Sequence, residues 1–354
     1  MDRISLLVNG SLYSGWKEVS FGRSLKTLCG GFTVSLTDKW LGQSKPWPIL
    51  PGDKCTFLID DDEELSGYVD DFNPSFDESA RTLSVTGRDI TGDVVDCSVE
   101  NPTTYRNVKL DRLVELIAKP FGISVTAAVD VGKPFPSWTI GPGENAFDAI
   151  DKAARERGVI AITDNKGGIL LTRAGTKKCS TALVQGQNAT SGSGMFSMKD
   201  RFSLYTVTSQ TTGVDEDSPD TAMGIKESAV DEGVPRYRPL CLSAESQTDA
   251  LAARNRVRWE ATRRAGEGSS ATVNVPGFRQ KDGRLWRINE LVMVKVPWLG
   301  IESAELLITG IGMRKSGEGT VTTIEIMLPQ AFQLLEKVSA QDALGRLLFR
   351  ESKK

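Results

Sequence analysis

The stretch LSVTGRDITGDVVDCS, residues 83–98, decides how the first part of this chain is interpreted. Its first residues alternate between apolar and polar side chains, which is the pattern of a β-strand with one buried face. Gly87, Arg88 and Asp89 end that strand, and Asp96 follows a turn later. A catalytic site would need a nearby base and an orienting partner, and none of these neighbours supplies one. We therefore interpret the stretch as structural.

The sequence suggests structural roles for Arg88, Asp89 and the two valines of this stretch. Asp89 is positioned to cap a helical turn beginning at Ile90 or Thr91. Arg88 is expected to pair with a carboxylate on a neighbouring strand or subunit, and the valines at 94–95 to pack under a β-barrel.

The residues before this stretch also indicate β-structure. Asn9-Gly10 is a favoured hairpin turn between two short apolar segments. Phe32, Val34 and Leu36 share one face of an alternating segment. Several short strands separated by turn signals predict a sandwich or small barrel that ends near residue 100.

The pattern changes after residue 101. A helix is expected over VKLDRLVELIAKPFG, with its apolar face ending at Pro120, and a second helix is expected to begin at Gly143-Glu144 and end at Gly158. A short strand separates the helices and a β-hairpin follows them, so residues 101–190 are predicted to form a small α+β domain.

The remaining residues are again mainly β. Residues 185–200 are interpreted as a linker, residues 211–235 as a mobile polar loop, and residues 243–268 as a long helix. Four alternating segments follow, and the charged tail 336–354 is expected to project from the fold.

Two of these β-regions share a pattern. Residues 52–87 and 289–328 each contain a polar lead-in, an alternating strand, a strand with a central glycine (Gly67 and Gly310), a polar turn and a threonine-rich strand. The pattern raises the possibility of two related β-modules in one chain.

Composition limits the chemistry. The 354 residues carry 43 Lys and Arg against 46 Asp and Glu, a formal charge of −3, which argues against a dedicated nucleic-acid binder. Histidine is absent, which removes serine–histidine and cysteine–histidine catalysis and histidine-ligated zinc. The five cysteines are widely spaced without a CxxC, so a metal knuckle or disulfide framework is not expected. Neither a signal peptide nor a membrane span is expected.

Several clusters could be sites, and each has a simpler reading. The acidic run 60–64 lacks the ligand order of a calcium loop and is expected to be a solvated hairpin turn. Glu144 and Asp148 could form a hydrolase pair but fit a helix start as well. Trp259 and Trp286 are expected to be core or interface anchors. We predict no catalytic, cofactor-binding or metal-binding residue.

The arginines of the long helix could contact DNA, but acidic residues between them dilute the positive charge, so a solvated or subunit-contacting face is favoured. These arginines are Arg254, Arg256, Arg258, Arg263 and Arg264.

The opening stretch resembles a segment of the baseplate hub proteins of Mu-like contractile-tailed phages and the wider late-control-D group. Further segments resemble that family in the same order over roughly residues 4–335. They are Arg23-Ser24-Leu25, Gly30-Gly31-Phe32, Pro51-Gly52-Asp53, Ser66-Gly67-Tyr68-Val69-Asp70, Lys119-Pro120-Phe121-Gly122-Ile123, Gly143-Glu144-Asn145-Ala146-Phe147-Asp148-Ala149-Ile150, Gly277-Phe278-Arg279 and Gly283-Arg284-Leu285-Trp286.

The resemblance implies an α+β, mainly β fold: two related antiparallel, tube-like β-barrel domains (1–100 and 191–335) with the small α+β domain 101–190 between them. It also implies a homotrimeric ring of pseudo-sixfold symmetry that joins the hexameric tail tube to the trimeric central spike. The other expected partners are further baseplate proteins, and genome DNA would pass through a channel without specific binding. Gly87, Arg88, Asp89, Asp96, Gly143, Glu144, Gly283 and Trp286 are then fold-defining residues.

On this reading the protein is a virion component, made and assembled in the host cytoplasm without membrane insertion, and not an enzyme. Two alternatives remain open from the residues alone. One is a carboxylate-dependent cell-wall hydrolase of the tail tip, and the other is a monomeric glycan- or receptor-binding tail protein.

Overall fold

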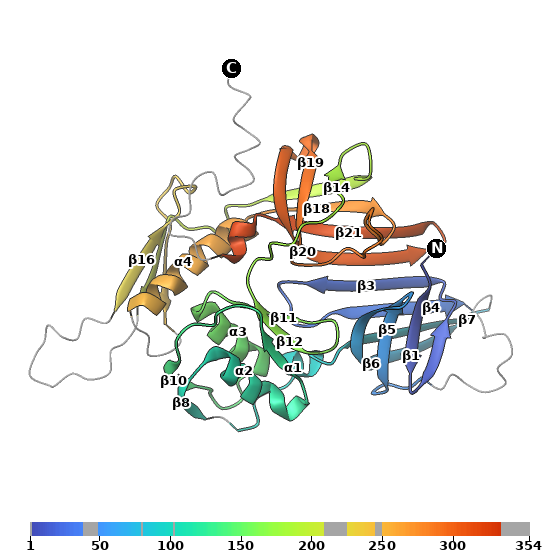
Figure 1. Ribbon diagram of the computed structural model, residues 1–354, viewed down its shortest axis with the longest axis horizontal. Helices are drawn as coiled ribbons and strands as arrows, with labels where there is room; N and C mark the ends of the chain where they lie inside the picture. Colours follow the sequence, from blue (N-terminus) through green and yellow to red (C-terminus); the bar gives the residue numbers. More distant parts are fainter. Residues whose placement is uncertain are drawn as a thin grey trace, which may run out of the picture.

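A computed structural model describes residues 2–37, 49–78, 81–101, 103–208, 225–244 and 250–333. Within these residues the protein is mainly β, with antiparallel sheets dominating and two groups of helices beside them (Figure 1). Thirteen strands join in one sheet that passes through both β-regions of the sequence. The tail 336–354 and part of the predicted mobile loop, residues 211–224, lie outside the described residues.

The first β-region contributes seven strands, as its alternating pattern predicts. They are β1 (Ile4–Val8), β2 (Ser11–Ser14), β3 (Glu18–Ser24), β4 (Gly31–Thr37), β5 (Lys54–Ile59), β6 (Asp62–Phe76) and β7 (Arg81–Asp89). Asn9 and Gly10 both have positive φ and form a two-residue turn between β1 and β2, which confirms the predicted hairpin. Phe32, Val34 and Leu36 are buried on one face, as expected.

The second β-region contributes six strands to the same sheet. They are β13 (Leu183–Val184), β14 (Ser191–Phe196), β18 (Ser269–Pro276), β19 (Leu291–Val296), β20 (Ile301–Ser316) and β21 (Gly319–Met327). The linker predicted over 185–200 is therefore wrong in part, because β14 lies inside it and pairs with β18. Its serine and glycine residues show no apolar alternation, and β18 supplies the template that makes them a strand.

The two β-regions join edge to edge. Strand β3 pairs antiparallel with β20, with Gly22 opposite Gly312 and Phe21 opposite Met313 (Figure 1). Apolar side chains of both regions form one continuous core cluster. The sheet then runs as an open path from β14 at one end to β2 at the other, within the part of the chain that the structure describes.

The repeat suggested by the sequence corresponds to two three-strand units of matching size. Strands β5, β6 and β7 have 6, 15 and 9 residues, and β19, β20 and β21 have 6, 16 and 9. Each long strand has a bulge, between Val69 and Asp71 in β6 and between Ile308 and Gly310 in β20. Aligned on the bulges, Gly310 matches Asp71 rather than Gly67, so the two glycines of the sequence pattern are not equivalent.

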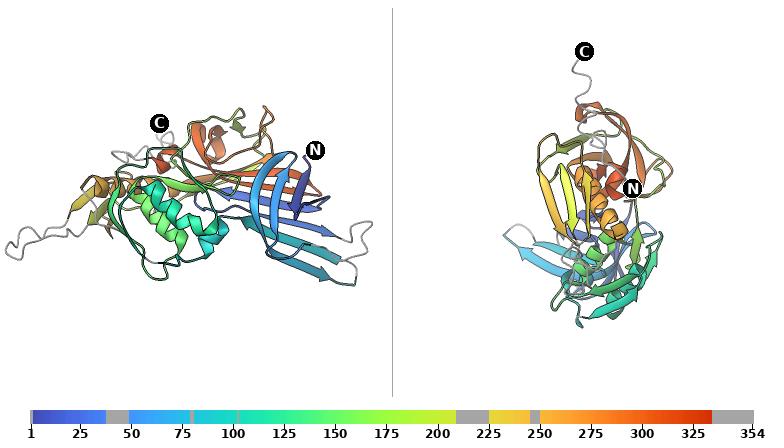
Figure 2. Two further views of the ribbon diagram at one scale, coloured as in Figure 1. Left: turned by 60° about the horizontal axis from the view of Figure 1, so that its bottom comes forward. Right: turned by 90° about the vertical axis from the view of Figure 1, so that its left-hand side faces the viewer.

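A smaller unit lies beside the long strands. It contains β8 (Thr104–Val108), α2 (Leu110–Ala118), the 3-10 turn η1 (Lys119–Phe121), β9 (Val125–Ala127), β10 (Phe135–Thr139), α3 (Ala146–Glu156), β11 (Ile160–Thr163) and β12 (Ile169–Thr172). Helices α2 and α3 lie side by side, away from the long strands (Figure 2). The predicted apolar face of α2 is buried, and positive φ at Gly122 and Gly158 follows the helix ends, as expected.

The short helix α1 (Gly92–Asp96) belongs to this smaller unit. Val94 is fully buried in the core that α2 and α3 form, and Val95 packs against it. The prediction that residues 94–95 pack under a β-barrel is therefore wrong. The turn after β7 directs them toward the helices instead.

A third core lies under the long helix α4 (Ala250–Glu267). Strands β15 (Leu204–Thr208), β16 (Lys226–Val230) and β17 (Pro239–Ser243) form a separate sheet that α4 covers. Residues 191–335, expected to form one barrel domain, thus hold strands of two sheets. Strand β16 also lies within the segment predicted as a mobile loop, so that prediction is wrong for residues 226–230. Two 3-10 turns, η3 (Pro297–Leu299) and η4 (Pro329–Phe332), also lie in the second β-region.

Candidate functional site

The end of β7 places two charged neighbours on opposite sides of the sheet. Successive side chains of a strand point to opposite faces. The Asp89 side chain is fully buried, whereas the Arg88 side chain is 38% exposed. The motif therefore divides into an outer ion pair and an inner one.

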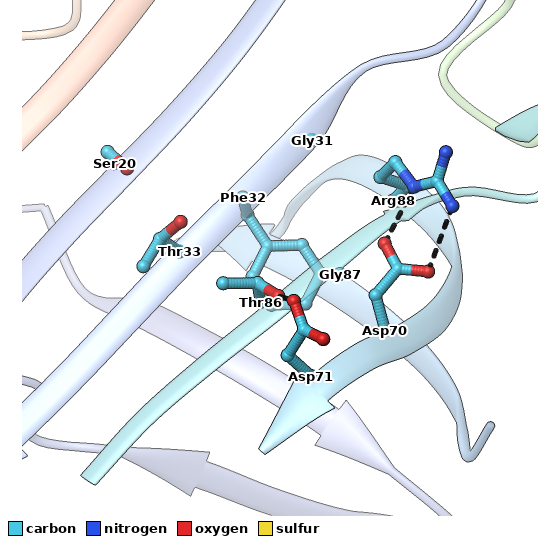
Figure 3. A pocket seen from close by; sticks show the side chains of 9 residues that line it. All are labelled: Ser20, Gly31, Phe32, Thr33, Asp70, Asp71, Thr86, Gly87 and Arg88. Carbon is cyan, nitrogen blue, oxygen red and sulfur yellow. Dashed lines mark hydrogen bonds and ion pairs between the residues drawn. The ribbon is translucent and has the colours of Figure 1, made fainter. Parts of the chain in front are cut away.

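Arg88 holds two carboxylates on the outer side. Its Nε lies 2.7 Å from Asp70 Oδ2 and its Nη2 lies 3.3 Å from Asp70 Oδ1, so the bond to β6 is bidentate (Figure 3). Its Nη1 and Nη2 also donate to Asp96 at 3.1 and 2.7 Å. These bonds, those to Asp96 most of all, raise the pKa of Arg88, and the bond from Arg88 lowers the pKa of Asp96. The predicted pairing of Arg88 with a carboxylate on a neighbouring strand is confirmed.

Asp89 is the acceptor for several inner donors. The hydroxyl of Thr163 donates to its Oδ2 at 2.6 Å, and the N–H and hydroxyl of Thr91 donate to its Oδ1 at 3.2 and 3.1 Å. Arg23 Nη2 lies 3.4 Å from Oδ2. Burial raises the pKa of Asp89, although all these donors oppose the rise. Helix α1 begins at Gly92, so Asp89 supports the turn before the helix through Thr91 rather than capping the helix itself.

Arg23 connects this pair to the rest of the molecule. Its guanidinium also donates to the carbonyl of Glu64 in β6 and to the side chain of Asn165 at the tip of the β11–β12 hairpin. Burial lowers the pKa of Arg23 despite the nearby charges of Asp89 and Glu64. The carboxylate of Glu64, fully buried, accepts from Arg287 of the second β-region, and burial raises its pKa. The network joins both β-regions to the small α+β unit.

Glycines allow the strands to approach closely at this site. A Cβ placed on Gly87 would lie 2.6 Å from the ring of Phe32 and from the carbonyl oxygen of Tyr68. A Cβ on Gly67 would lie 1.9 Å from the carbonyl oxygen of Arg88. Only glycine fits at either position.

The segment around residue 144 also has a structural role. Gly143 has φ +73°, and Asn145 caps α3 by accepting from the backbone N–H groups of Phe147 and Asp148. Helix α3 therefore begins at Ala146, two residues after the predicted start at Gly143-Glu144, because an asparagine side chain supplies the cap.

Glu144 is held in its ionised form. Burial raises its pKa, but hydrogen bonds from Lys152 at 2.9 Å and from the N–H of Gly141 at 2.8 Å outweigh this effect, and the net pKa is lowered. A general acid needs the opposite shift. The geometry therefore gives no support to a hydrolase based on Glu144 and Asp148.

Gly283 and Trp286 form a turn against the first β-region. Gly283 has φ +83°, and Trp286 is fully buried, with its backbone N–H donating to the carbonyl of Phe278 at 3.1 Å. Arg279 bonds to the carbonyl of Gly283 and pairs with carboxylates of the first β-region, namely Asp2, Asp60 and Asp62 at 2.9, 2.7 and 3.1 Å. The acidic run 60–64 forms the predicted hairpin turn between β5 and β6, with Asp61 and Glu63 exposed. The expectation that all of its charges are solvated is wrong in part, because Asp60 and Asp62 bind Arg279 and Glu64 is buried.

The arginines of α4 are mostly paired within the fold. Arg256 is buried and pairs with the equally buried Glu260, which also binds Arg264. Arg254 pairs with Glu227 of β16. The predicted solvated arginine face is therefore wrong for Arg256. Trp259, on the same helix, is buried in a separate apolar cluster with Ile160 and Phe332, as predicted for one of the two anchors.

The surface around Arg88 forms a shallow open depression on strands β3, β4, β6 and β7 (Figure 3). Its charged groups are paired within it, since Asp70 pairs with Arg88 and the hydroxyl of Thr86 donates to Asp71. Within the described ranges, no cluster of histidine, cysteine, aspartate or glutamate could hold a metal ion. No helix in the described part of the chain is long and apolar enough to cross a membrane.

Sequence reasoning found Arg88 and Asp89 but missed the inner network. Arg23 appeared in the sequence only as part of a family-like segment, and Glu64 only as one member of an acidic run. Arg287 carried no signal. The exposed or buried state of such charges depends on strands that lie far apart in the sequence.

Three family profiles match successive parts of the chain. They are described as "Mu phage baseplate assembly protein GpP-like, N-terminal" (residues 3–89), "Baseplate hub protein gp44-like, second domain" (91–173) and "Mu phage baseplate assembly protein GpP, fourth domain" (249–335). Baseplate hub protein gp44 of Escherichia phage Mu is 28% identical over 340 residues, covering 92% of this chain and 88% of that protein.

Solved structures agree with these profiles. The 43 kDa tail protein of prophage MuSo2 from Shewanella oneidensis is 35% identical, covers 94% of this chain and 100% of its own, and has a TM-score of 0.83. The tail protein from Neisseria meningitidis MC58 shares the fold, with 21% identity, 93% and 99% coverage and a TM-score of 0.78. With profiles over most of its length and a relative of 35% identity over nearly all of it, the chain belongs to the baseplate hub proteins of Mu-like phages and is a virion component of the phage tail.

Proposed function

We propose that this hub protein forms a homotrimeric ring of pseudo-sixfold symmetry, which adapts the hexameric tail tube to the trimeric central spike. The observation that carries the proposal is the repeated three-strand unit, β5-β6-β7 and β19-β20-β21, with strand lengths that agree to within one residue and equivalent bulges. Three chains with two such units each present six similar surfaces to the tube and three chain-specific surfaces to the spike.

Each unit is proposed to belong to one tube-like barrel domain of the assembled ring. The first domain is residues 1–100 and the second is residues 191–335. The α+β domain 101–190 would lie outside the ring wall. Support comes from the edge-to-edge joint of β3 and β20, which already places the two units in one continuous sheet. Tail tube protein, central spike and other baseplate proteins are the proposed partners.

The ring is proposed to leave a channel through which the genome passes without specific binding. A net charge of −3 is compatible with only weak contact between the protein and a polyanion. The protein would act as a structural adaptor and not as an enzyme. The five cysteines are all free thiols, which fits folding and assembly in the reducing host cytoplasm.

Solution mass and particle imaging test the proposal together. The expected result is a particle of three times 38.5 kDa that appears in projection as a ring with a central hole, about sixfold on one face and threefold on the other. Imaging of the assembled tail provides the same test where the free protein does not assemble. A solid monomeric globule at the tail tip would contradict the proposal.

A further inference from the structure

Strand β14 in the second β-region and part of β6 in the first each have one edge with no partner strand among the described residues. Strand β14 pairs with β18 on one edge only, and all six of its residues are exposed. Residues 71–76 of β6 pair with β7, while their other edge has no partner strand among the described residues, because β5 covers only residues 62–68 and the backbone of Gly52 and Asp53 bonds to Val69. Open edges of this kind are templates for pairing with another chain.

The joint inside the chain shows how such an edge is filled. In β20, strand β19 covers residues 301–307, and β3 covers residues 310–315 on the same edge. Aligning the two long strands on their bulges makes residues 71–76 of β6 equivalent to residues 310–315 of β20. The open edge of β6 therefore corresponds to the edge that β3 occupies on β20.

The free strand β14 corresponds in turn to β3. In the first unit, β3 pairs with β4 and β4 with β7; in the second, β14 pairs with β18 and β18 with β21. Ser20 of β3 lies opposite Thr33, and Ser193 of β14 lies opposite Thr272. Thr33 lies opposite Thr86 of β7, which lies opposite Asp71 at the bulge of β6. Thr272 lies opposite Glu325 of β21, which lies opposite Gly310 at the bulge of β20. Because Asp71 and Gly310 are equivalent, Ser193 is the equivalent of Ser20.

We propose that β14 of one copy pairs antiparallel with residues 71–76 of β6 in the next copy, repeating the joint of β3 and β20. Because Ser20 lies opposite Arg314 in that joint, Ser193 lies opposite Ser75 of the neighbouring copy. The same register places Phe196 opposite Phe72 and Gly192 opposite Phe76. The partner is a second copy of this chain, so the inference rests on the proposed trimer and specifies its interface.

The side chains of the two edges suit this joint. Residues 191–194 of β14 are Ser-Gly-Ser-Gly, which lets a neighbouring strand approach closely. Phe76 is 85% exposed and would cover Gly192, while Met195 is 58% exposed and would lie beside Asn73. Pro74 of β6 offers no N–H, so the proposed joint receives no ladder hydrogen bond from this residue; proline is tolerated in a strand at such an edge.

The proposed contact also accounts for a closed ring of three chains rather than an open filament. The contact joins one surface of the chain to a different surface of the next copy, and such heterologous contacts form a ring when the rotation closes. If the joint between copies repeats the joint within the chain, six equivalent units complete the circle after three chains.

A cysteine cross-link between Ser75 and Ser193 tests the register. Phage tails assembled from a hub protein that carries both Ser75→Cys and Ser193→Cys are oxidised and run on a non-reducing gel. The pair is equivalent to Arg314 and Ser20, and opposite residues of an antiparallel ladder lie within the Cα separation that a disulfide requires. We expect most of the protein to move from 38.5 kDa to the dimer and trimer positions and to return with reductant.

The matched control is Asn73→Cys with Ser193→Cys. Asn73 is exposed on the same strand but lies two residues out of register, where the Cα separation of about 7–8 Å exceeds the disulfide range. This control and each single variant are expected to stay at the monomer position, which also excludes cross-linking through the exposed Cys97 and Cys241.

Amine cross-linking of the same tails separates the two proposals. Trimers by amine cross-linking, with no disulfide between positions 75 and 193, would overturn this interface and leave the trimer in place. A stronger disulfide with Asn73→Cys would overturn the register. Absence of trimers by either reagent would overturn both this inference and the proposed function.

Discussion

Arg23 Nη2 lies 3.4 Å from the carboxylate of Asp89, and both side chains are buried where the first β-region meets the β11–β12 hairpin. The hydroxyl of Thr163, in β11, donates to the same carboxylate. The pair therefore fixes the position of the small α+β unit against the long strands, and its loss should affect the whole fold rather than one loop.

Removing the carboxylate of Asp89 should destabilise the protein strongly. Asp89→Ala leaves the guanidinium of Arg23 buried without its nearest opposite charge and takes the acceptor from Thr163 and Thr91. Breaking a buried pair from one side costs about 3–5 kcal/mol. Denaturant unfolding followed by circular dichroism measures this loss. Glu302→Gln, on the exposed face of β20, is the control and should leave the midpoint unchanged. Equal stability of Asp89→Ala and the control would show that the pair does not hold the units together.

Loss of the outer ion pair between Arg88 and Asp96 should change the pKa of Asp96 more clearly than it changes the free energy of unfolding. The hydrogen bond from Arg88 lowers the pKa of Asp96, so its ionised form favours folding above pH 3.8, and this contribution is lost as the pH falls through the lowered folded value. In Arg88→Gln, NMR titration should show the pKa of Asp96 rising toward its ordinary value. Because Asp96 is 53% exposed, the change in stability should stay below about 1 kcal/mol. An unchanged pKa would contradict the bidentate contact.

The cap of α3 gives a local prediction. The Asn145 side chain accepts from two backbone N–H groups at the helix start, and its Nδ2 donates to the carbonyl of Val95 at 2.6 Å. Asn145→Ala should lower the free energy of unfolding by about 1 kcal/mol, the usual cost of losing a cap. Thermal unfolding measures it, and Asn145→Asp, which keeps the cap acceptor but not the bond to Val95, should recover part of the loss. If the aspartate variant is no more stable than the alanine variant, the cap is not the cause.

The sequence predicted the elements that depend on local patterns. Periodicity placed the buried face of α2, and Asn9-Gly10 placed the first hairpin, because both depend on neighbouring residues. It did not predict the Arg23–Asp89 pair, whose members are 66 residues apart, or strand β14, whose Ser-Gly composition has no strand pattern of its own. Such features depend on the strands beside them in the folded sheet. The resemblance of the opening stretch identified the family but not these contacts.

Arg279 should control how firmly the acidic turn is attached to the second β-region. Arg279→Gln removes the three ion pairs to Asp2, Asp60 and Asp62, each of them partly exposed and worth about 0–1 kcal/mol. Hydrogen exchange measured by mass spectrometry should therefore become faster in peptides covering residues 60–62, with little change elsewhere. Arg284→Gln is the control, because Arg284 pairs with Asp282 and Glu290 of its own region. Faster exchange at 60–62 in that control as well would show that the turn is not held by Arg279.

The close approach of β6 to β7 makes Gly67 the least replaceable glycine of the site. A Cβ there would lie 1.9 Å from the carbonyl oxygen of Arg88, which is backbone and cannot rotate away. Gly67→Ala must therefore push the strands apart, and overpacking of this kind costs at least about 1–3 kcal/mol. Gly317→Ala is the matched control, because a Cβ on Gly317 meets nothing within 4 Å and no positive φ forbids it. We expect a lower melting temperature and a lower soluble yield for Gly67→Ala alone; if both variants melt together, β6 and β7 do not approach each other as closely as described.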